Sequence, residues 1–160
     1  MQPYHLRRSE KAITASEQLL AIIHGQKYMT LALALDDEPY LVTLSYAYDN
    51  AAQCFYFHCA AEGRKMDYLR RNPVVWGQIV EDGGYLDGKC SHAFRAVQFR
   101  GTVSFLEDAE EKRAALELMI DHLESDPDMV KQKQITGKTV DRVTIGKVTV
   151  EFMTGKQNGV

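Results

Sequence analysis

Runs of β-forming residues separated by turn-forming residues constrain the fold of this 160-residue chain more than any other feature. The runs are rich in Val, Ile, Thr, Tyr and Phe, whose branched or aromatic side chains suit a pleated, half-buried surface. Asp-Asp and Asp-Asn pairs between the early runs favour tight turns, so successive runs are expected to pair as antiparallel neighbours. Six strands are predicted, at residues 28–35, 39–48, 53–59, 74–82, 93–106 and 142–153.

Two segments in the first half of the chain have helical patterns. Thr14 and Glu17 have the spacing of a capping box ahead of a stretch rich in Leu and Ile, which predicts a helix over residues 16–24. A second helix is predicted over residues 64–71, because Pro73 is incompatible with its continuation.

A third helix is predicted in the second half, where Asp108 and Glu111 repeat the capping spacing. Its apolar residues recur at i, i+3, i+4 and i+7, the spacing of a helix face that is buried in a core. Gly83 and Gly84 predict a loop, and a polar tail is expected after residue 153. The residues of the apolar helix face are Leu116, Met119, Ile120 and Leu123.

The order of these elements predicts a mainly β protein with peripheral helices, in which six antiparallel strands form a closed or partly closed barrel. Strands do not alternate with helices as βαβ units, and Gly83-Gly84 lacks the flanking strand, glycine spacing and helix of a dinucleotide fingerprint, which argues against a Rossmann fold. With 45% hydrophobic residues, the chain is expected to form a single domain over residues 1–160.

Charge and hydropathy exclude two classes of partner. The net charge of −3 is made of mixed signs and leaves no basic face, so nucleic acid binding is not expected. No leader-like apolar segment and no run of about 18 apolar residues occurs, so no membrane association and a cytoplasmic location are expected.

The three cysteines, Cys54, Cys59 and Cys90, are expected to stay reduced, because an odd number cannot form a closed disulfide framework. Cys54 and Cys59 point to opposite faces of an extended strand. A zinc site that joined them to Cys90 and His92 is therefore disfavoured, and no metal is predicted.

Residues 55–73 change from a strand pattern to a helix pattern through Gly63, and Arg64 and Lys65 begin the helix. A helix N-terminus offers free backbone N–H groups and the positive end of the helix dipole, to which two cations add charge-assisted hydrogen bonds for a phosphate. The alternative is that both cations lie on an ordinary solvated helix face. His58, on the preceding strand, is either a hydrogen-bonded structural residue or a group that contacts the ligand and transfers protons.

Four sequence blocks occur in a characteristic order: RRSEKAIT, DDEPYLVTLSYAYD, YFHCAAEGRKMDYLRRNPVV and FRAVQFRGTVSFLEDAEEKRAALELMIDHL. In this order they resemble the pyridoxamine 5'-phosphate oxidase-related, FMN-binding split-barrel superfamily, and within it the nitroimidazole-resistance proteins, over residues 6–156. The resemblance implies a homodimeric split β-barrel with FMN at each end of the subunit interface. It also implies that the strand around His58 and the turn Gly63-Arg64-Lys65 hold the FMN phosphate, while the strand around Thr43 to Tyr46 lies along the isoalloxazine.

Strand parity adds further candidates for flavin contact. Thr43 and Ser45 share a face and could offer hydroxyl or adjacent backbone N–H groups to the polar edge of the flavin. Gln78 is a candidate on the fourth predicted strand, and polar residues of the fifth could reach the FMN of the partner subunit, although strand charges also protect sheet edges. The predicted FMN-binding residues are Thr43, Leu44, Ser45, Tyr46, His58, Gly63, Arg64, Lys65, Gln78, Arg95 and Gln98.

A homodimer is also expected because the long fifth predicted strand carries more apolar side chains than one small core requires: Phe94, Val97 and Phe99. Trp76, by contrast, is assigned to that core.

The resemblance implies an FMN-dependent oxidoreductase that takes electrons from NAD(P)H or a protein carrier and reduces a small acceptor such as a nitroaromatic (a nitroimidazole) or a quinone. His58 is the predicted catalytic residue. The ending typical of true pyridoxamine phosphate oxidases is missing, so that reaction is not expected. The alternative is a non-enzymatic flavin- or haem-binding split-barrel protein, in which His58 or His5 ligates iron.

Overall fold

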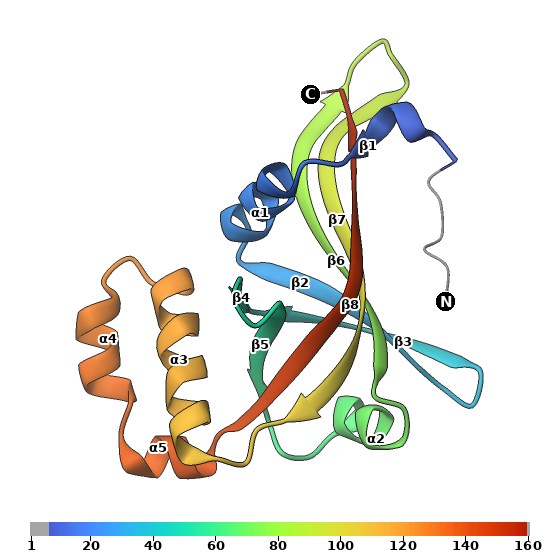
Figure 1. Cartoon of the computed structure of the whole chain (residues 1–160). Helices are drawn as coiled ribbons and strands as arrows, with labels where there is room; N and C mark the ends of the chain where they lie inside the picture. The colour runs from blue at the N-terminus through green and yellow to red at the C-terminus, as the bar shows by residue number, and fades with distance from the viewer. Residues whose placement is uncertain (1–6, 160) are drawn as a thin grey trace.

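One antiparallel sheet, curved into a barrel and bordered by helices, forms the protein in a computed structural model that describes residues 7–159 (Figure 1). The long strands β6, β7 and β8 run the length of the molecule, with α3 to α5 grouped at one end and the β6–β7 hairpin at the other. The elements are η1 (Ser9–Lys11), β1 (Ala12–Ile13), α1 (Ser16–Gly25), β2 (Tyr28–Leu35), β3 (Glu38–Ser45), β4 (Ala47–Asp49), β5 (Cys54–Cys59), α2 (Arg64–Arg71), β6 (Val74–Leu86), β7 (Ser91–Phe105), α3 (Ala109–Leu123), α4 (Pro127–Gln134), α5 (Gly137–Arg142) and β8 (Thr144–Asn158).

The sheet has the strand order β3-β2-β6-β7-β8-β5-β4, and β1 pairs with the end of β8. The edge strands β3 and β4 are not paired with each other, yet they are separated in the chain by Tyr46 alone. The chain itself therefore closes the barrel where hydrogen bonding does not. The predicted mainly β split barrel is confirmed, and the strand count rises from six to eight because residues 39–48 divide at Tyr46 and because β1 adds a short strand.

The hairpin between β2 and β3 forms as local sequence predicts. Asp36 and Asp37 both have positive φ, 50° and 65°, and Leu35 pairs with Glu38 across the two-residue loop. Positive φ at both loop positions is the geometry of the type I′ turn, whose twist matches that of the flanking strands.

Two strand glycines provide space for aromatic rings in the barrel interior. Gly77 is the register partner of Phe99, and Gly146 is the register partner of Phe57. A Cβ atom at Gly77 would lie 2.0 Å from the ring of Phe99, so no larger residue fits there without displacing the ring. The Phe99 ring stacks on Phe55 at a centroid distance of 4.4 Å, in the fully buried centre of the core.

Helices close the barrel at two places. Helix α1 buries Ile22 and Ile23, and the carbonyl of Ile23 accepts a 2.6 Å hydrogen bond from the hydroxyl of the fully buried Tyr46. Helix α3 packs on β4 and β5, and Lys27 Nζ donates to the carbonyls of His122 and Leu123 at its C-terminus, where free carbonyls and the helix dipole favour a cation.

Three local expectations need correction, and two helices lie outside the predicted elements. Helix α1 has Ala15 at its N-cap and no side-chain capping bond, so the Thr14–Glu17 capping box is absent. Gly83 and Gly84 lie inside β6 rather than in a loop, because the strand continues to Leu86 through a register shift between Asp82 and Tyr85. The predicted polar tail is the end of β8, which pairs with β7 as far as Asn158. Helices α4 and α5 lie outside the predicted elements; they begin at side-chain caps from Asp126 and Thr136, and Asp126-Pro127 is a typical helix start.

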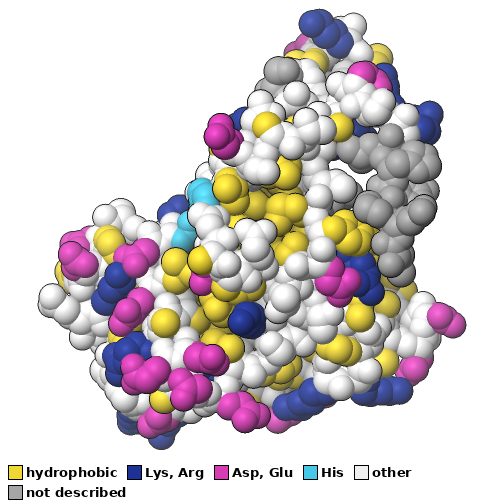
Figure 2. Space-filling view, viewed as in Figure 1, with side chains coloured by type: hydrophobic (Ala, Val, Ile, Leu, Met, Phe, Trp, Pro, Cys, Tyr) yellow, Lys and Arg dark blue, Asp and Glu magenta, His cyan; other side chains and the backbone are white. Residues whose placement is uncertain are grey.

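Acidic and basic side chains are interspersed over α3 and α4 on the face shown in Figure 2, without a field of one sign. No helix within residues 7–159 is long and apolar enough to cross a membrane.

Candidate functional site

A row of polar side chains crosses five neighbouring strands at one level of the sheet. The register pairs Thr43 with Thr30, Thr30 with Gln78, Gln78 with Gln98, and Gln98 with Thr154. All five are exposed or half-buried, whereas the side chains that alternate with them face the core, so the row lies on the outer face of the barrel. The hydroxyls of Thr30 and Thr43 are 3.2 Å apart, within hydrogen-bond distance. We call these five residues the polar row.

Large apolar side chains border the polar row on the same face. Leu41 is 65% exposed and Trp76 is 41% exposed, although Trp76 was expected in the core. The Trp76 ring meets Phe152 edge to face at 5.4 Å. Tyr28 and Val80 extend this apolar border and are also exposed.

Three cavities of about 450, 240 and 230 Å³ lie along this face, and Gln78 lines all three. Tyr28 and Val80 line the largest, Thr154 and Gln98 the second, and Trp76 the third. A surface with apolar walls and a few convergent polar groups suits a planar ligand that carries hydrogen-bonding edges.

The turn before α2 keeps the properties of an anion site. Gly63 has φ of 120° and serves as the N-cap without a side-chain bond, while its carbonyl accepts from Met66 and Asp67. Within residues 7–159 the backbone N–H groups of Arg64 and Lys65 make no hydrogen bond, and they lie at the positive end of the helix dipole.

The two cations of this turn differ in their partners. Arg64 Nη2 donates to Glu38 at 2.6 Å, and the guanidinium lies over the Tyr40 ring at 4.7 Å. Lys65 is half-buried and makes no ion pair in the described part of the chain. Burial raises the pKa of the neighbouring Cys59 thiol, and the charge of Lys65 opposes that shift. Lys65 is therefore the cation that is available to a ligand.

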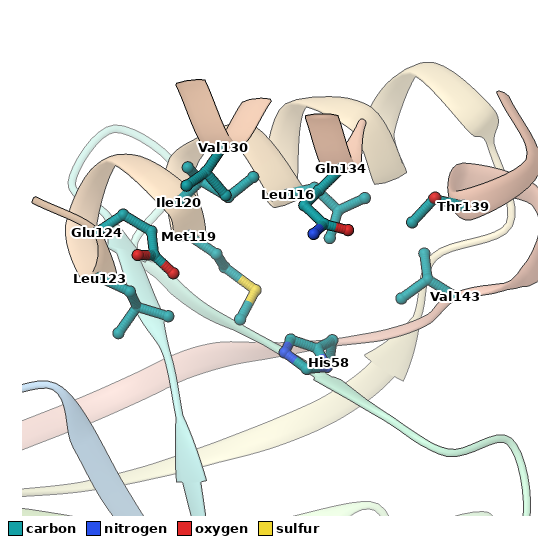
Figure 3. Close-up of a pocket in the computed structure, with 10 residues that line it drawn as sticks. All are labelled: His58, Leu116, Met119, Ile120, Leu123, Glu124, Val130, Gln134, Thr139 and Val143. Atoms are coloured by element: carbon teal, nitrogen blue, oxygen red, sulfur yellow. The ribbon is translucent and has the colours of Figure 1, made fainter. Parts of the chain in front are cut away.

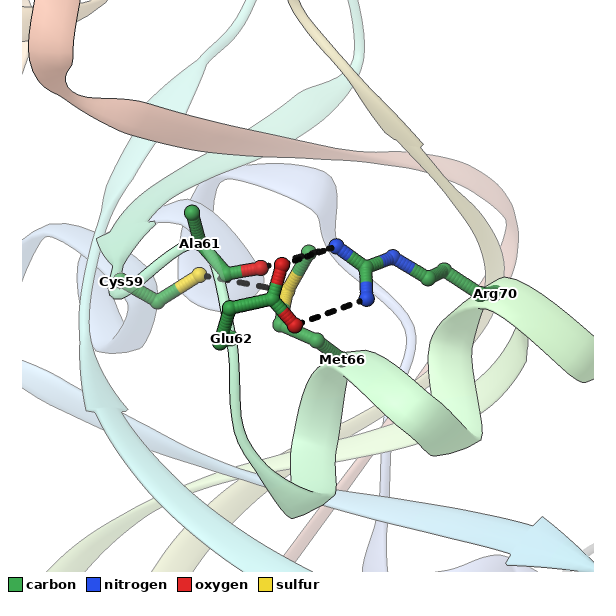
Figure 4. A network of polar contacts seen from close by, with 5 residues as sticks. All are labelled: Cys59, Ala61, Glu62, Met66 and Arg70. Atoms are coloured by element: carbon green, nitrogen blue, oxygen red, sulfur yellow. Dashed lines mark hydrogen bonds and ion pairs between the residues drawn. The ribbon is translucent and has the colours of Figure 1, made fainter.

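Polar contacts hold the loop ahead of this turn in place (Figure 4). Arg70 reaches back from α2 and donates to the carbonyl of Ala61 at 2.9 Å and to the carboxylate of Glu62 at 3.2 Å. Cys59 Sγ lies 3.7 Å from Met66 Sδ on the other side of the loop. These contacts join residues seven to nine apart, which no local pattern indicates.

The turn and the polar row meet at the edge strand β3. Arg64 contacts Glu38 and Tyr40 at the start of this strand, and Thr43 lies three residues further along, about 10 Å at the rise of an extended chain. Ser45 lies on the same outer face as Thr43. Within residues 7–159 β3 pairs with β2 alone, so its other edge leaves backbone groups free for a ligand.

His58 lies in a different cavity from the polar row. It projects from β5 into a cavity of about 380 Å³ beneath α3, α4 and α5, opposite Met119 (Figure 3). The apolar stripe of α3, expected to be core, lines this cavity: Leu116, Met119, Ile120 and Leu123. His58 lines none of the three cavities along the polar row, and Gln78 does not line the His58 cavity.

The side chains of three other predicted contacts point away from the polar row. Leu44 is half-buried on the inner side of β3, and burial raises the pKa of Tyr46. Arg95 is on the opposite face of β7 from Gln98, in a bidentate pair with Glu81 at 2.9 and 2.6 Å. Leu44 and Tyr46 can therefore reach an outer-face ligand only through their backbone.

Sequence reasoning missed two members of the polar row, Thr30 and Thr154. Threonine is common in strands, so nothing local distinguishes them. Only their register with Thr43, Gln78 and Gln98 brings them into the row.

Comparison with known proteins gives one family match that covers most of the chain. A model of the pyridoxamine 5'-phosphate oxidase family matches residues 15–157. The structure of a candidate 5-nitroimidazole antibiotic resistance protein from Bacteroides thetaiotaomicron VPI-5482 is 30% identical, with a TM-score of 0.77 over 91% of this chain and 86% of that chain. An uncharacterized protein of Rhizobium meliloti (strain 1021), RA0666, is 33% identical over 70 residues, which span 43% of this chain and 44% of that protein.

Two further structures are similar in fold alone, since each is only 15% identical. The flavocytochrome Anf3 from Azotobacter vinelandii has a TM-score of 0.83, covering 100% of this chain and 75% of its own. The FAD and heme binding protein from Mycobacterium smegmatis has a TM-score of 0.77, covering 94% of this chain and 74% of its own.

Proposed function

Because this chain belongs to the pyridoxamine 5'-phosphate oxidase family, we propose that it is a homodimeric FMN-dependent oxidoreductase that reduces a small acceptor such as a nitroaromatic or a quinone. One arrangement carries the proposal. A helix N-terminus with an available Lys65 adjoins the edge strand of a face on which five polar side chains lie between exposed aromatic residues.

The α2 turn fits the phosphate of FMN. Two free backbone N–H groups, the helix dipole and the Lys65 ammonium all favour a dianion. Gly63 at positive φ leaves open space where a side chain would stand, since nothing lies within 4 Å of a Cβ built there. Arg64 joins the phosphate site when its guanidinium leaves Glu38.

The outer sheet face fits the flavin ring. The hydroxyls of Thr43 and Ser45 and the free edge of β3 supply donors and acceptors for the polar edge of a flavin. Gln78 and Gln98 supply amides from the middle of the sheet, on the same subunit or on its partner.

A second copy of the chain is the proposed cover for this face. Within residues 7–159, five of the six exposed large apolar side chains lie on strands of the sheet, a clustering that is unusual on a monomer surface: Tyr28, Leu41, Trp76, Val80 and Tyr85. The expectation from Phe94, Val97 and Phe99 needs correction, because Val97 and Phe99 are fully buried within one subunit.

Bound FMN would accept a hydride from a nicotinamide and pass two electrons to the acceptor. The residues of this chain would bind and orient both molecules: Lys65 holds the phosphate, Thr43 and Gln78 contact ring edges, and Trp76 with Leu41 excludes water from one side. His58 is retained as a proposed catalytic residue only if the acceptor extends from the polar row into the separate His58 cavity.

A second candidate function is a flavin- or haem-binding protein without catalytic turnover. The apolar His58 cavity of about 380 Å³ supports it, because one histidine among apolar side chains is a plausible axial ligand. Two of the structural neighbours are named a flavocytochrome and an FAD and heme binding protein, which also supports this candidate. His5, the other proposed iron ligand, lies outside the described residues.

The cofactor is tested by the visible spectrum of the freshly purified protein and by chromatography of whatever is released on denaturation. FMN is expected, whereas a dominant Soret band would favour haem. The chain has a single tryptophan, Trp76, on the proposed ring face, so titration of the flavin-free protein with FMN should quench its fluorescence with one FMN per subunit.

Turnover is tested with NADH and NADPH as donors and with menadione, a nitroimidazole and pyridoxamine 5'-phosphate as candidate substrates. Reduction of the first two is expected. Flavin binding without any turnover would favour the carrier over the enzyme.

The dimer is tested by sedimentation of the wild type and of Leu41→Arg, with Met129→Arg as the control, because Met129 is exposed on α4 away from the sheet. A dimer that dissociates only in Leu41→Arg is expected. A wild type that sediments as a monomer at micromolar concentration would refute the dimer.

A further inference from the structure

An Asp–His pair lies in the cavity next to the polar row. His92 Nε2 is 2.6 Å from Asp82 Oδ1, and both residues line the cavity of about 450 Å³ that Gln78 shares. Phe94 and Val80 form apolar walls of the same cavity. The pair therefore faces the space in which a ligand held against Gln78 would lie.

A β-bulge brings the two residues together. Asp82 pairs with Phe94, and the register shift at Gly83-Gly84 then places Tyr85 opposite His92. His92 and Phe94 share a face of β7, so His92 is a diagonal neighbour of Asp82 on the outer face. Gly84 has φ of 85°, a conformation that most other residues avoid.

Hydrogen bonds to the backbone hold both partners in place. The N–H of Gly84 donates to Asp82 Oδ1 at 2.8 Å, and Asn158 Nδ2 donates to the carbonyl of His92 at 2.6 Å. Lys11 in turn donates to the side-chain oxygen of Asn158. The pair is thus fixed to three strands rather than placed on a free loop.

The protonation pattern follows from these bonds. The hydrogen bonds from His92 and from the Gly84 N–H hold the pKa of Asp82 below its ordinary value. An ionised carboxylate only accepts, so His92 donates from Nε2–H. Within residues 7–159 the other ring nitrogen, Nδ1, makes no hydrogen bond. A histidine oriented by a carboxylate in this way presents its other ring nitrogen, Nδ1, to a ligand for proton transfer.

We propose that His92 is a catalytic residue that gives a proton to the small acceptor bound against Gln78, and that Asp82 is the residue that positions it. The inference rests on the proposed oxidoreductase function. His58, the residue that the sequence favoured for this role, lies in a separate cavity. The other titratable side chains that face His92 are Tyr85 on β6, with a ring-centroid distance of 6.4 Å, and Lys11 through Asn158.

The proton balance is simplest for a quinone, whose conversion to a hydroquinone consumes two electrons and two protons. When bound, reduced FMN would supply a hydride, which amounts to both electrons and one proton, and the quinone would become the hydroquinone monoanion. The His92 imidazolium then loses its Nδ1 proton to the second quinone oxygen, where an O–H bond forms. Solvent restores the proton, since the His92 side chain is 48% exposed.

The first test is kinetic and uses the flavin-loaded dimer with menadione, in stopped-flow measurements of the reoxidation of prereduced flavin across the neutral pH range. His92→Gln is expected to slow this step by about 10²-fold, the usual contribution of a positioned acid. The wild-type rate should fall as pH rises and the His92→Gln rate should not. The rate of Asp82→Asn should lie between those of wild type and His92→Gln. His24 is a matched exposed histidine on α1, and His24→Gln should have the wild-type rate.

The second test needs no turnover. In the flavin-free protein with labelled histidine rings, menadione should shift the NMR signals of His92 and leave those of His24 unchanged.

Several outcomes would overturn the inference. In the kinetic test, these are a His92→Gln variant that keeps the wild-type rate and pH profile, or a loss of rate that occurs only in His58→Gln. In the NMR test, it is a menadione-induced shift at His58 without one at His92. A loss of FMN affinity in His92→Gln that accounts for its slower rate would also overturn it. A wild type that binds flavin but reduces no acceptor would instead refute the proposed function, and this inference with it.

Discussion

Replacement of Lys65 by methionine should weaken FMN binding more than the same replacement of Arg64. Lys65 is half-buried at the start of α2 and makes no ion pair within residues 7–159. Arg64 is already paired with Glu38 at 2.6 Å and lies over the Tyr40 ring at 4.7 Å. Methionine keeps most of the apolar stem of either side chain and removes only the charge and its donors.

The magnitudes follow from these different surroundings. A hydrogen bond to a charged group contributes about 1.5 to 3 kcal/mol, so Lys65→Met should raise the Kd for FMN by roughly 10- to 150-fold. Arg64 must first give up its exposed ion pair with Glu38, so its net contribution, and the effect of Arg64→Met, should be smaller.

The assay is titration of flavin-free protein with FMN and, separately, with riboflavin, followed by the fluorescence of Trp76 or of the flavin. Riboflavin lacks the phosphate, so its affinity should hardly change in either variant. Lys133→Met, on the exposed surface of α4, is the matched control for loss of one lysine charge.

An equal loss of riboflavin and FMN affinity in Lys65→Met would show that Lys65 acts on folding or on the ring site, and would refute the phosphate assignment. A larger effect from Arg64→Met than from Lys65→Met would refute the argument that the Glu38 pair weakens Arg64 as a ligand.

Three further predictions concern stability and are each measured by denaturant unfolding. Burial holds the pKa of His122 below its ordinary value, so the folded state keeps this ring neutral. The contribution of the neutral ring to stability is present above about pH 6.5 and is lost on acidification. The free energy of unfolding should therefore fall less between about pH 7 and pH 5 in His122→Gln than in wild type. Gly77→Ala should destabilise by about 2 kcal/mol or more because its Cβ would enter an aromatic ring, whereas Gly137→Ala, with nothing within 4 Å, should change stability by less than about 0.5 kcal/mol. Asp108→Ala should cost about 1 kcal/mol because Asp108 caps α3, whereas Thr14→Ala should cost little because Thr14 forms no capping bond.

Local patterns predicted elements whose determinants lie within a few residues. The strand at 28–35 and the helix at 64–71 have the predicted bounds, since side-chain alternation and a following proline act locally. The turn at Asp36-Asp37 and the cap at Asp108 are of the same kind. The family resemblance then predicted the split barrel as a whole.

Patterns that depend on a partner far along the chain were misjudged. Trp76 and Gln78 lie on one face, as strand parity predicts, but whether that face is core or surface depends on what covers it, and no side chain within residues 7–159 buries it. The apolar stripe of α3 lines the His58 cavity because α4 and α5, which the predicted elements do not include, lie beside it.

Local sequence patterns specify the strand and helix periods, the hairpin turn and the α2 turn with its two cations, and the order of the sequence blocks indicates the family. Folding brings Thr43, Gln78 and Gln98 into one row. It also pairs Arg64 with Glu38, leaves Lys65 available and places His58 in a separate cavity. Backbone conformation depends on neighbours within a few residues. A site on a sheet depends instead on the register between strands that lie tens of residues apart, where one bulge changes which side chains meet.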